Sequence, residues 1–109
     1  WLNGVWTGIG YQQEGVTWLI KFTAATSKNE FQIEYPSIGG SGGQWKLIEQ
    51  DCATDRYTFE EAITPPTGIT RDSGRIIISK VTNDYMSYSY FRPPTFETMT
   101  SWSTLRREA

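Results

Sequence analysis

Apolar and polar side chains alternate with a period of two along almost the whole chain. Between Val16 and Ala24, every second residue is apolar, and the positions between them include Thr17, Lys21 and Thr23. Such alternation is typical of a β-strand that buries one face. The pattern predicts eight strands: Val5–Gln13, Val16–Ala24, Glu30–Tyr35, Gln44–Gln50, Arg56–Ile63, Arg75–Val81, Tyr85–Phe91 and Thr98–Arg107.

Turn-forming residues separate the strands, and no stretch of ten residues has the periodicity of a helix. The glycine-rich segment Pro36–Gly43 is expected to be a loop, because Pro and Gly hold a strand ladder poorly. Short antiparallel strands can form a sandwich or an up-and-down barrel. Hairpin-like spacing throughout, without the long connection of a Greek key, favours the barrel. We therefore predict an all-β fold: a single domain, residues 1–109, forming one eight-stranded antiparallel up-and-down β-barrel.

Composition supports this fold and excludes several kinds of chemistry. The length of 109 residues suits one domain, and Val, Ile and Thr, which favour strands, far outnumber Ala and Leu. Without His and with one Cys, the chain lacks Ser-His-Asp catalysis, His-ligated zinc and an internal disulfide. The adjacent pair Glu60-Glu61 is no acid–base pair, because neighbouring strand residues face opposite ways. We predict a protein that is not an enzyme and carries no cofactor or metal.

Charge and hydropathy narrow the range of partners. The formal net charge is -2 and no basic cluster occurs, which argues against nucleic acid as a partner. No apolar run approaches the roughly 18 residues of a membrane-spanning helix. The chain begins with Trp1 rather than Met, so we expect a processed or excised piece. Removal of a secretion signal would explain this start, and so would excision from a longer protein. We favour the first explanation and expect a secreted or periplasmic protein.

Two motifs stand near the ends of the chain, Gly4-Val5-Trp6 near the start and Leu105-Arg106-Arg107 near the end. Together they resemble the calycin superfamily, which includes lipocalins and avidins. In calycins, a Gly-x-Trp in the first strand meets an Arg or Lys from the last strand. The resemblance implies that Trp6 plugs one end of the barrel. Arg106 or Arg107 then stacks on its ring by a cation–π interaction and donates to nearby carbonyls.

A longer series of motifs covers nearly the full chain: Gly4-x-Trp6-x-Gly8, Tyr35-Pro36-Ser37-Ile38, Gly42-Gly43-x-Trp45-x-Leu47, Phe59-x-Glu61-x-Ile63, Asp72-x-Gly74, Tyr88-x-Tyr90 and Thr104-Leu105-x-Arg107. Together these motifs resemble a small bacterial barrel module, which is secreted alone or appended to signalling kinases and caspase-like proteins. The function of that module is largely uncharacterised, so the resemblance bears on fold more than on activity.

The chain departs in its details from both the bacterial module and the avidins. Members of the bacterial module often pair two cysteines, and Ser41 and Thr70 stand at those places here. Cys52, in a different loop, cannot replace that disulfide and is expected to be an ordinary thiol. Tyr35-x-Ser37 resembles a ligand-binding pair of avidins, but Gly8 stands where avidins have a polar clamp residue. Biotin is therefore not the expected ligand.

Aromatic residues are the main candidates for a binding site, since five Trp and six Tyr exceed what a narrow barrel can bury. The phase set by Trp6 predicts an interior that includes Trp18, Phe31, Trp45, Phe59 and Trp102. Tyr88 and Tyr90 share one face of their strand, which is either an outward contact surface or part of the core.

Glu61 shares a face with Phe59, so its carboxylate needs a partner if that face is buried. It either forms a structural ion pair with Arg75, Arg92 or Arg106, or anchors the polar part of a ligand. The Pro36–Gly43 loop either forms one side of the barrel mouth or is a wide turn.

The function predicted from the sequence is non-catalytic binding. The leading hypothesis is a module that binds or senses a small or apolar ligand at the barrel mouth. The alternative is a protein-interaction or inhibitor barrel with a filled core, whose surface aromatics bind another protein or a second copy of the chain. The candidate ligand-binding residues are Tyr35, Ser37, Trp45, Glu61, Tyr88 and Tyr90.

Overall fold

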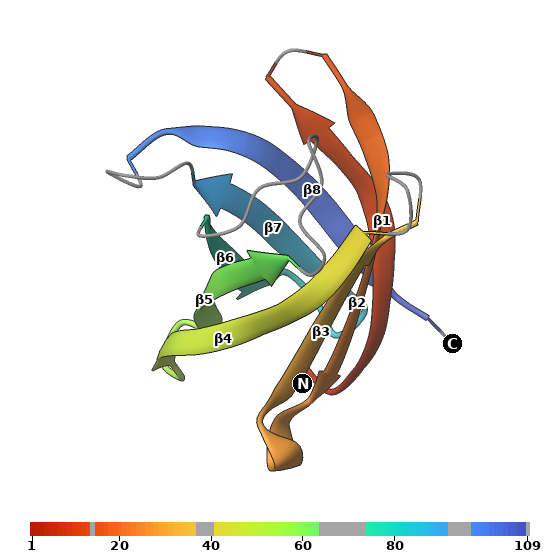
Figure 1. Ribbon diagram of the computed structural model, residues 1–109. Coiled ribbons are helices and arrows are strands. Elements are labelled where there is room, and N and C mark those ends of the chain that lie inside the picture. Colours follow the sequence, from red (N-terminus) through yellow and green to blue (C-terminus); the bar gives the residue numbers. More distant parts are fainter. Residues whose placement is uncertain (14, 37–40, 64–73, 92–96, 109) are drawn as a thin grey trace.

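A computed structural model describes residues 1–13, 15–36, 41–63, 74–91 and 97–108, with the side chains of residues 41, 42 and 61–63 excluded. The described part of the chain contains eight strands and one short 3₁₀ turn, η1 (Thr26–Lys28) (Figure 1). The strands are β1 (Gly4–Gln12), β2 (Thr17–Ala25), β3 (Glu30–Tyr35), β4 (Ser41–Asp51), β5 (Arg56–Ile63), β6 (Arg75–Lys80), β7 (Tyr85–Phe91) and β8 (Met99–Arg107). No helix among the described residues is long and apolar enough to span a membrane.

Each strand pairs antiparallel with the next one along the chain, and β8 pairs with β1 to close the ring (Figure 1). The predicted eight-stranded up-and-down barrel is confirmed. Because neighbouring strands run in opposite directions, the connections alternate between the two ends of the barrel. The segment before β1 lies with the β2–β3, β4–β5 and β6–β7 turns, and we call this the closed end. The β1–β2 turn, the last residues of β3, β5 and β7 and the first residues of β4, β6 and β8 lie at the other end, which we call the distal end.

The seam between β1 and β8 depends on one glycine and one serine. Backbone pairing at the seam joins Trp6 to Arg107 near one end and Gln12 to Ser101 near the other. Between these pairs, the Ser103 hydroxyl donates a 2.7 Å hydrogen bond to the Ile9 carbonyl. A Cβ at Gly8 would lie 2.7 Å from the backbone oxygen of Thr104. Glycine therefore allows the two strands to approach closely here.

The prediction that the whole of Pro36–Gly43 is a loop is wrong. Strand β4 already begins at Ser41, and Gly42 and Gly43 pair with Glu34 and Ile33 of β3. Gly43 also pairs with β5, so ladders on both sides hold this glycine in a strand despite its low β-propensity. Residues 37–40 lie outside the described part of the chain.

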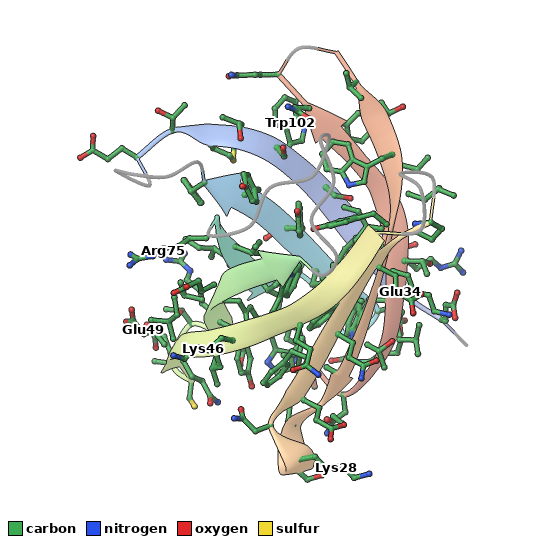
Figure 2. All side chains as sticks on the ribbon, viewed as in Figure 1. Lys28, Glu34, Lys46, Glu49, Arg75 and Trp102 are labelled. Carbon is green, nitrogen blue, oxygen red and sulfur yellow. The ribbon has the colours of Figure 1, made fainter. Side chains whose placement is uncertain are left out.

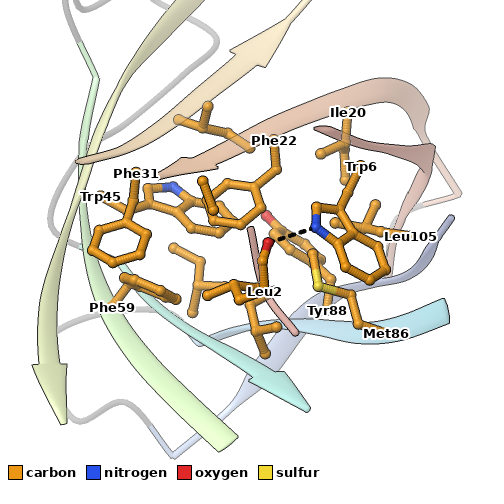
Figure 3. Close-up of a cluster of buried hydrophobic side chains, with 14 of the residues drawn as sticks. Leu2, Trp6, Ile20, Phe22, Phe31, Trp45, Phe59, Met86, Tyr88 and Leu105 are labelled. Carbon is orange, nitrogen blue, oxygen red and sulfur yellow. Dashed lines mark hydrogen bonds between the residues drawn. The ribbon is translucent and has the colours of Figure 1, made fainter. Parts of the chain in front are cut away.

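The interior is filled by alternate side chains of the strands, as the period-two pattern predicts. Along β2, the buried residues are Trp18, Ile20, Phe22 and Ala24. Aromatic rings occupy the centre: the ring centroids of Phe22 and Trp45 lie 4.6 Å apart, and those of Trp45 and Tyr88 lie 5.9 Å apart (Figure 3). Strands from different sides of the barrel thus meet in one aromatic cluster.

Candidate functional site

Residues 1–3, which precede β1, fill the closed end, and we call them the plug. Leu2 is fully buried, and its carbonyl accepts a 2.9 Å hydrogen bond from the indole N–H of Trp6 (Figure 3). The ring of Trp1 packs edge-on against Trp6 at 6.2 Å and against Tyr57 at 5.8 Å between centroids. Since Trp6 is itself fully buried, an apolar side chain and two indole rings fill this end.

Arg107 fastens the plug. Its guanidinium carbon lies 4.3 Å from the centroid of the Trp6 ring, and its N–H groups donate to the carbonyls of Trp1, Asn3 and Asn83. Arg106 is exposed, because neighbouring strand residues face opposite sides of the sheet. Of the two arginines considered for closure, Arg107 lies over Trp6 and Arg106 does not.

Asn3 ties the plug to the turn η1 between β2 and β3. Its side-chain oxygen accepts hydrogen bonds from the backbone N–H of Thr26 at 2.7 Å and from the Thr26 hydroxyl at 2.8 Å. Thr26 opens the turn η1 between β2 and β3. The plug is therefore held from β8 on one side and from η1 on the other, which makes the closed end structural rather than a site of ligand entry.

Tyr57 lies beside the plug and has a perturbed pKa. Burial raises the pKa of its phenol above 10.0, and the nearby charges of Cys52 and Asp55 raise it further. The amide of Gln50 donates 3.2 Å hydrogen bonds to the Tyr57 hydroxyl and to the Cys52 sulfur. Cys52 is exposed and unbridged, as expected of an ordinary loop thiol.

Trp45 and Tyr88, two of the candidate ligand-binding residues, lie together in the middle of the barrel. Each has about 2% of its surface exposed, and Trp45 is stacked between Phe22 and Tyr88. The alternative in which Tyr88 faces outward is wrong: Tyr85, on the opposite face of β7, is 42% exposed. These three rings join β2, β4 and β7 in the interior of the barrel.

At the distal end, two aromatic rings occupy the space that a side chain on a neighbouring glycine would need. A Cβ on Gly10 would come within 2.6 Å of the Trp18 indole, and a Cβ on Gly74 would come within 2.1 Å of the Tyr90 ring. Tyr35 packs edge-on against Trp18, with 6.5 Å between ring centroids. Because glycine has no side chain, these rings can lie along the wall instead of crossing the interior.

Hydroxyl groups that the sequence analysis did not single out line the buried side of β8. Thr100, Ser101 and Ser103 are 1%, 5% and 6% exposed. Trp102 was predicted to face inward but is 41% exposed. The inward positions of Leu105 and Arg107 determine the phase of β8, and this phase turns Trp102 outward. Had the phase been counted back from Arg107, it would have placed Ser101 and Ser103 inside the barrel.

Some of the remaining candidate residues lie outside the described part of the chain, and others have no described side chain. Glu61 pairs with Trp45 across β4 and β5, but its side chain is not described, so its predicted partner remains a prediction. Ser37, Thr70 and Arg92 lie outside the described part of the chain. Arg75 pairs opposite Glu60 in the ladder between β5 and β6.

Within the described part of the chain, no three His, Cys, Asp or Glu side chains gather closely enough to hold a metal ion. The distal end carries the rings of Trp18 and Tyr90 and the buried hydroxyl-bearing residues Thr100 and Ser101. No protein-family model matches the chain, and no curated protein is significantly similar to it.

Proposed function

We propose that this protein is a non-catalytic, calycin-like barrel that binds a small apolar or aromatic ligand through its distal end. The two ends of the barrel differ in construction, and this supports the proposal. One end is sealed by an apolar plug under Arg107, whereas the distal end carries aromatic rings drawn back against the wall. A binding barrel needs one closed end and one end that a ligand can enter.

The observation that carries the proposal is the seating of Trp18 and Tyr90 on glycines. A glycine in or beside a strand is unfavourable by about 0.5–1 kcal/mol relative to alanine, and two such positions here leave room for large rings. We infer that these rings offer an aromatic face to a ligand at the distal end. Faces of this kind bind planar or apolar groups by stacking and by burial of apolar surface.

The interior also supplies a floor and polar contacts. The stack of Phe22, Trp45 and Tyr88 lies beneath the distal half and offers an apolar base. The buried hydroxyl-bearing residues Thr100 and Ser101 lie on the adjoining wall. Small-ligand sites combine such mostly apolar linings with a few polar groups that fix orientation. Residues Tyr35, Trp45, Tyr88 and Tyr90, with Ser37 and Glu61, are the proposed ligand contacts.

The resemblance to secreted bacterial barrels supports a secreted or periplasmic location. In that setting, the protein would bind or sense a ligand that it meets outside the cytoplasm. The small net charge and the absence of a basic cluster support a small molecule rather than nucleic acid as the ligand.

The test begins with native mass spectrometry of the purified protein, in which we expect a co-purified small molecule. Titration with the fluorescent probe 1-anilinonaphthalene-8-sulfonate then compares Gly10→Ala with Thr7→Ala, an alanine on the outward side of the same strand. Gly10→Ala should push Trp18 inward and weaken probe binding by about 10-fold or more, since small-to-large changes displace packed side chains. Thr7→Ala should bind the probe like the unmodified protein.

Near-UV circular dichroism shows whether Gly10→Ala keeps its packed aromatic core, and Trp18→Phe is a second variant with the same expected direction. The proposal fails if the protein carries no small molecule and binds the probe without saturation. It also fails if well-folded Gly10→Ala binds the probe as tightly as the unmodified protein.

A further inference from the structure

A β-bulge near the start of β8 buries two consecutive hydroxyl-bearing residues at the distal end. In the ladder between β7 and β8, Tyr90 pairs with Ser101 and Phe91 pairs with Met99. Thr100 is therefore an extra residue without a partner on β7. Thr100 and Ser101 are 1% and 5% exposed, whereas Met99 is 45% exposed. Because neighbouring strand residues otherwise face opposite ways, the bulge adds a second hydroxyl to the buried side of β8.

The protein itself uses only one of the buried hydroxyls that the described part of β8 carries. The Ser103 hydroxyl donates a 2.7 Å hydrogen bond to the Ile9 carbonyl. Within the described part of the chain, no residue forms a hydrogen bond with the hydroxyl of Thr100 or of Ser101. A buried hydroxyl without a partner destabilises a protein, because it has given up its hydrogen bonds to water. Such groups are rare in native proteins, and two adjacent ones indicate a place where an outside group binds.

The neighbours of Ser101 on both sides are partly exposed. Ser101 pairs with Tyr90 of β7 and with Gln12 of β1. Gln12 lies two residues after Gly10, the glycine against which the Trp18 indole packs, and therefore on the same face of β1. A ligand would reach the two hydroxyls past Tyr90 and Gln12, with aromatic rings on its way.

The surroundings of these hydroxyls favour an uncharged ligand. In the described part of the chain, the buried polar residues are Thr100, Ser101 and Ser103, and none of them carries a charge. The charged side chains labelled in Figure 2 are exposed and extend outward from the barrel: Lys28, Glu34, Lys46, Glu49 and Arg75. A carboxylate or ammonium group placed at the hydroxyls would lose its hydration without gaining an ion pair.

We propose that Thr100 and Ser101 bind the carbonyl oxygen of an uncharged ligand whose aromatic or apolar part packs against Trp18 and Tyr90. This inference rests on the proposed binding function and narrows its ligand to neutral molecules that carry a carbonyl group. Each hydroxyl can donate one hydrogen bond, and a carbonyl oxygen has two lone pairs to accept them. The ligand then supplies the partner that the protein does not.

Fluorescence titration with two neutral probes tests the proposal. One probe, 6-propionyl-2-(dimethylamino)naphthalene, carries a carbonyl group, and the other, 2-(dimethylamino)naphthalene, lacks it. The unmodified protein should bind the carbonyl probe about 10-fold more tightly or better, since a site built for hydrogen bonding rejects an analogue that cannot form the bonds.

Ser101→Ala and Thr100→Val should each weaken binding of the carbonyl probe by about 5-fold or more and leave binding of the other probe unchanged. Ser103→Ala is the matched control, because it removes a buried hydroxyl of the same strand that already has a partner in the protein. It should bind both probes like the unmodified protein. Near-UV circular dichroism verifies that each variant is folded.

Urea unfolding without probe gives a second readout, in which a purely structural role would produce the opposite result. Ser103→Ala should raise the equilibrium constant of unfolding by about 5-fold, because it leaves the Ile9 carbonyl without its hydrogen bond. Ser101→Ala and Thr100→Val should not raise this constant, because their hydroxyls have no partner to lose.

Three results overturn this inference and leave the proposed function standing. The first is equal binding of the two probes by the unmodified protein. The second is unchanged binding of the carbonyl probe by Ser101→Ala and Thr100→Val, which is expected if ordered water alone pairs with the hydroxyls. The third is a destabilisation of these variants as large as that of Ser103→Ala. If neither probe binds saturably, the proposed function fails, and this inference fails with it.

Discussion

Replacing Arg107 with methionine should destabilise the barrel more than any other single change at an arginine among the described residues. The guanidinium donates to three carbonyls and lies 4.3 Å over the Trp6 ring. Methionine keeps a similar apolar stem but loses all four interactions. The plug residues Trp1 and Asn3 then lose their attachment to β8, although the hydrogen bonds between Asn3 and Thr26 remain.

The size of the effect follows from these contacts. Three hydrogen bonds at about 1 kcal/mol each and a cation–π contact at about 0.5–1 kcal/mol come to about 3–4 kcal/mol. Arg107 is only partly buried, so water reaches the freed carbonyls and lowers the expected loss to about 2–3 kcal/mol. A domain of this size has a free energy of unfolding of about 5–15 kcal/mol, so the variant should still fold.

Equilibrium urea unfolding, followed by tryptophan fluorescence, measures the loss. Arg106→Met is the matched control, because Arg106 is the exposed neighbour of Arg107 and it is Arg107 that lies over the Trp6 ring. It should change the free energy of unfolding by less than about 0.5 kcal/mol. The reasoning is refuted if the two variants lose similar stability, or if Arg107→Met loses less than about 1 kcal/mol.

Three further predictions concern other parts of the barrel. Burial raises the pKa of Tyr57 in the folded state. The contribution of the neutral phenol to stability is therefore complete below pH 10 and is lost as pH rises through the folded pKa. Urea midpoints measured from about pH 9 upward should fall less steeply for Tyr57→Phe than for the unmodified protein. Asn29 has φ 54°, so Asn29→Ala should lower the free energy of unfolding by about 1 kcal/mol while Asn29→Gly changes it little, and equal losses would contradict this account. Ser103→Ala removes the hydrogen bond to the Ile9 carbonyl and should cost about 1 kcal/mol in thermal or urea unfolding, whereas no measurable loss would show that the seam does not need it.

The strand pattern could be predicted from the sequence because alternation and turn chemistry are local signals. Strand β3, predicted as Glu30–Tyr35, has those bounds in the structure, and β5 and β7 agree equally well. The beginning of β4 could not be predicted, since the ladders that hold Gly42 and Gly43 come from neighbouring strands. Local propensity is overridden wherever pairing on both sides satisfies the backbone.

The candidate site could be predicted only in part, because a period-two pattern does not say which face is inside. Where both faces of a strand carry aromatic residues, as at Tyr85 and Tyr88, only the packed barrel decides between them. The same ambiguity explains why the prediction that Trp102 faces inward was wrong. The stacking of Trp45 on Tyr88 joins β4 to β7, which are not neighbours in the sheet, so no local pattern contains it.

The seam between β1 and β8 has a consequence for the order in which the barrel folds. Seven of the eight ladders join strands that are consecutive in the chain, and these strand pairs can form as hairpins. The eighth brings Trp6 to Arg107 across nearly the whole chain, so its entropy of loop closure is the largest of all. We expect this seam to form after the folding transition state. Substitutions at Gly8, Ser103 and Arg107 should then speed unfolding and leave the folding rate almost unchanged.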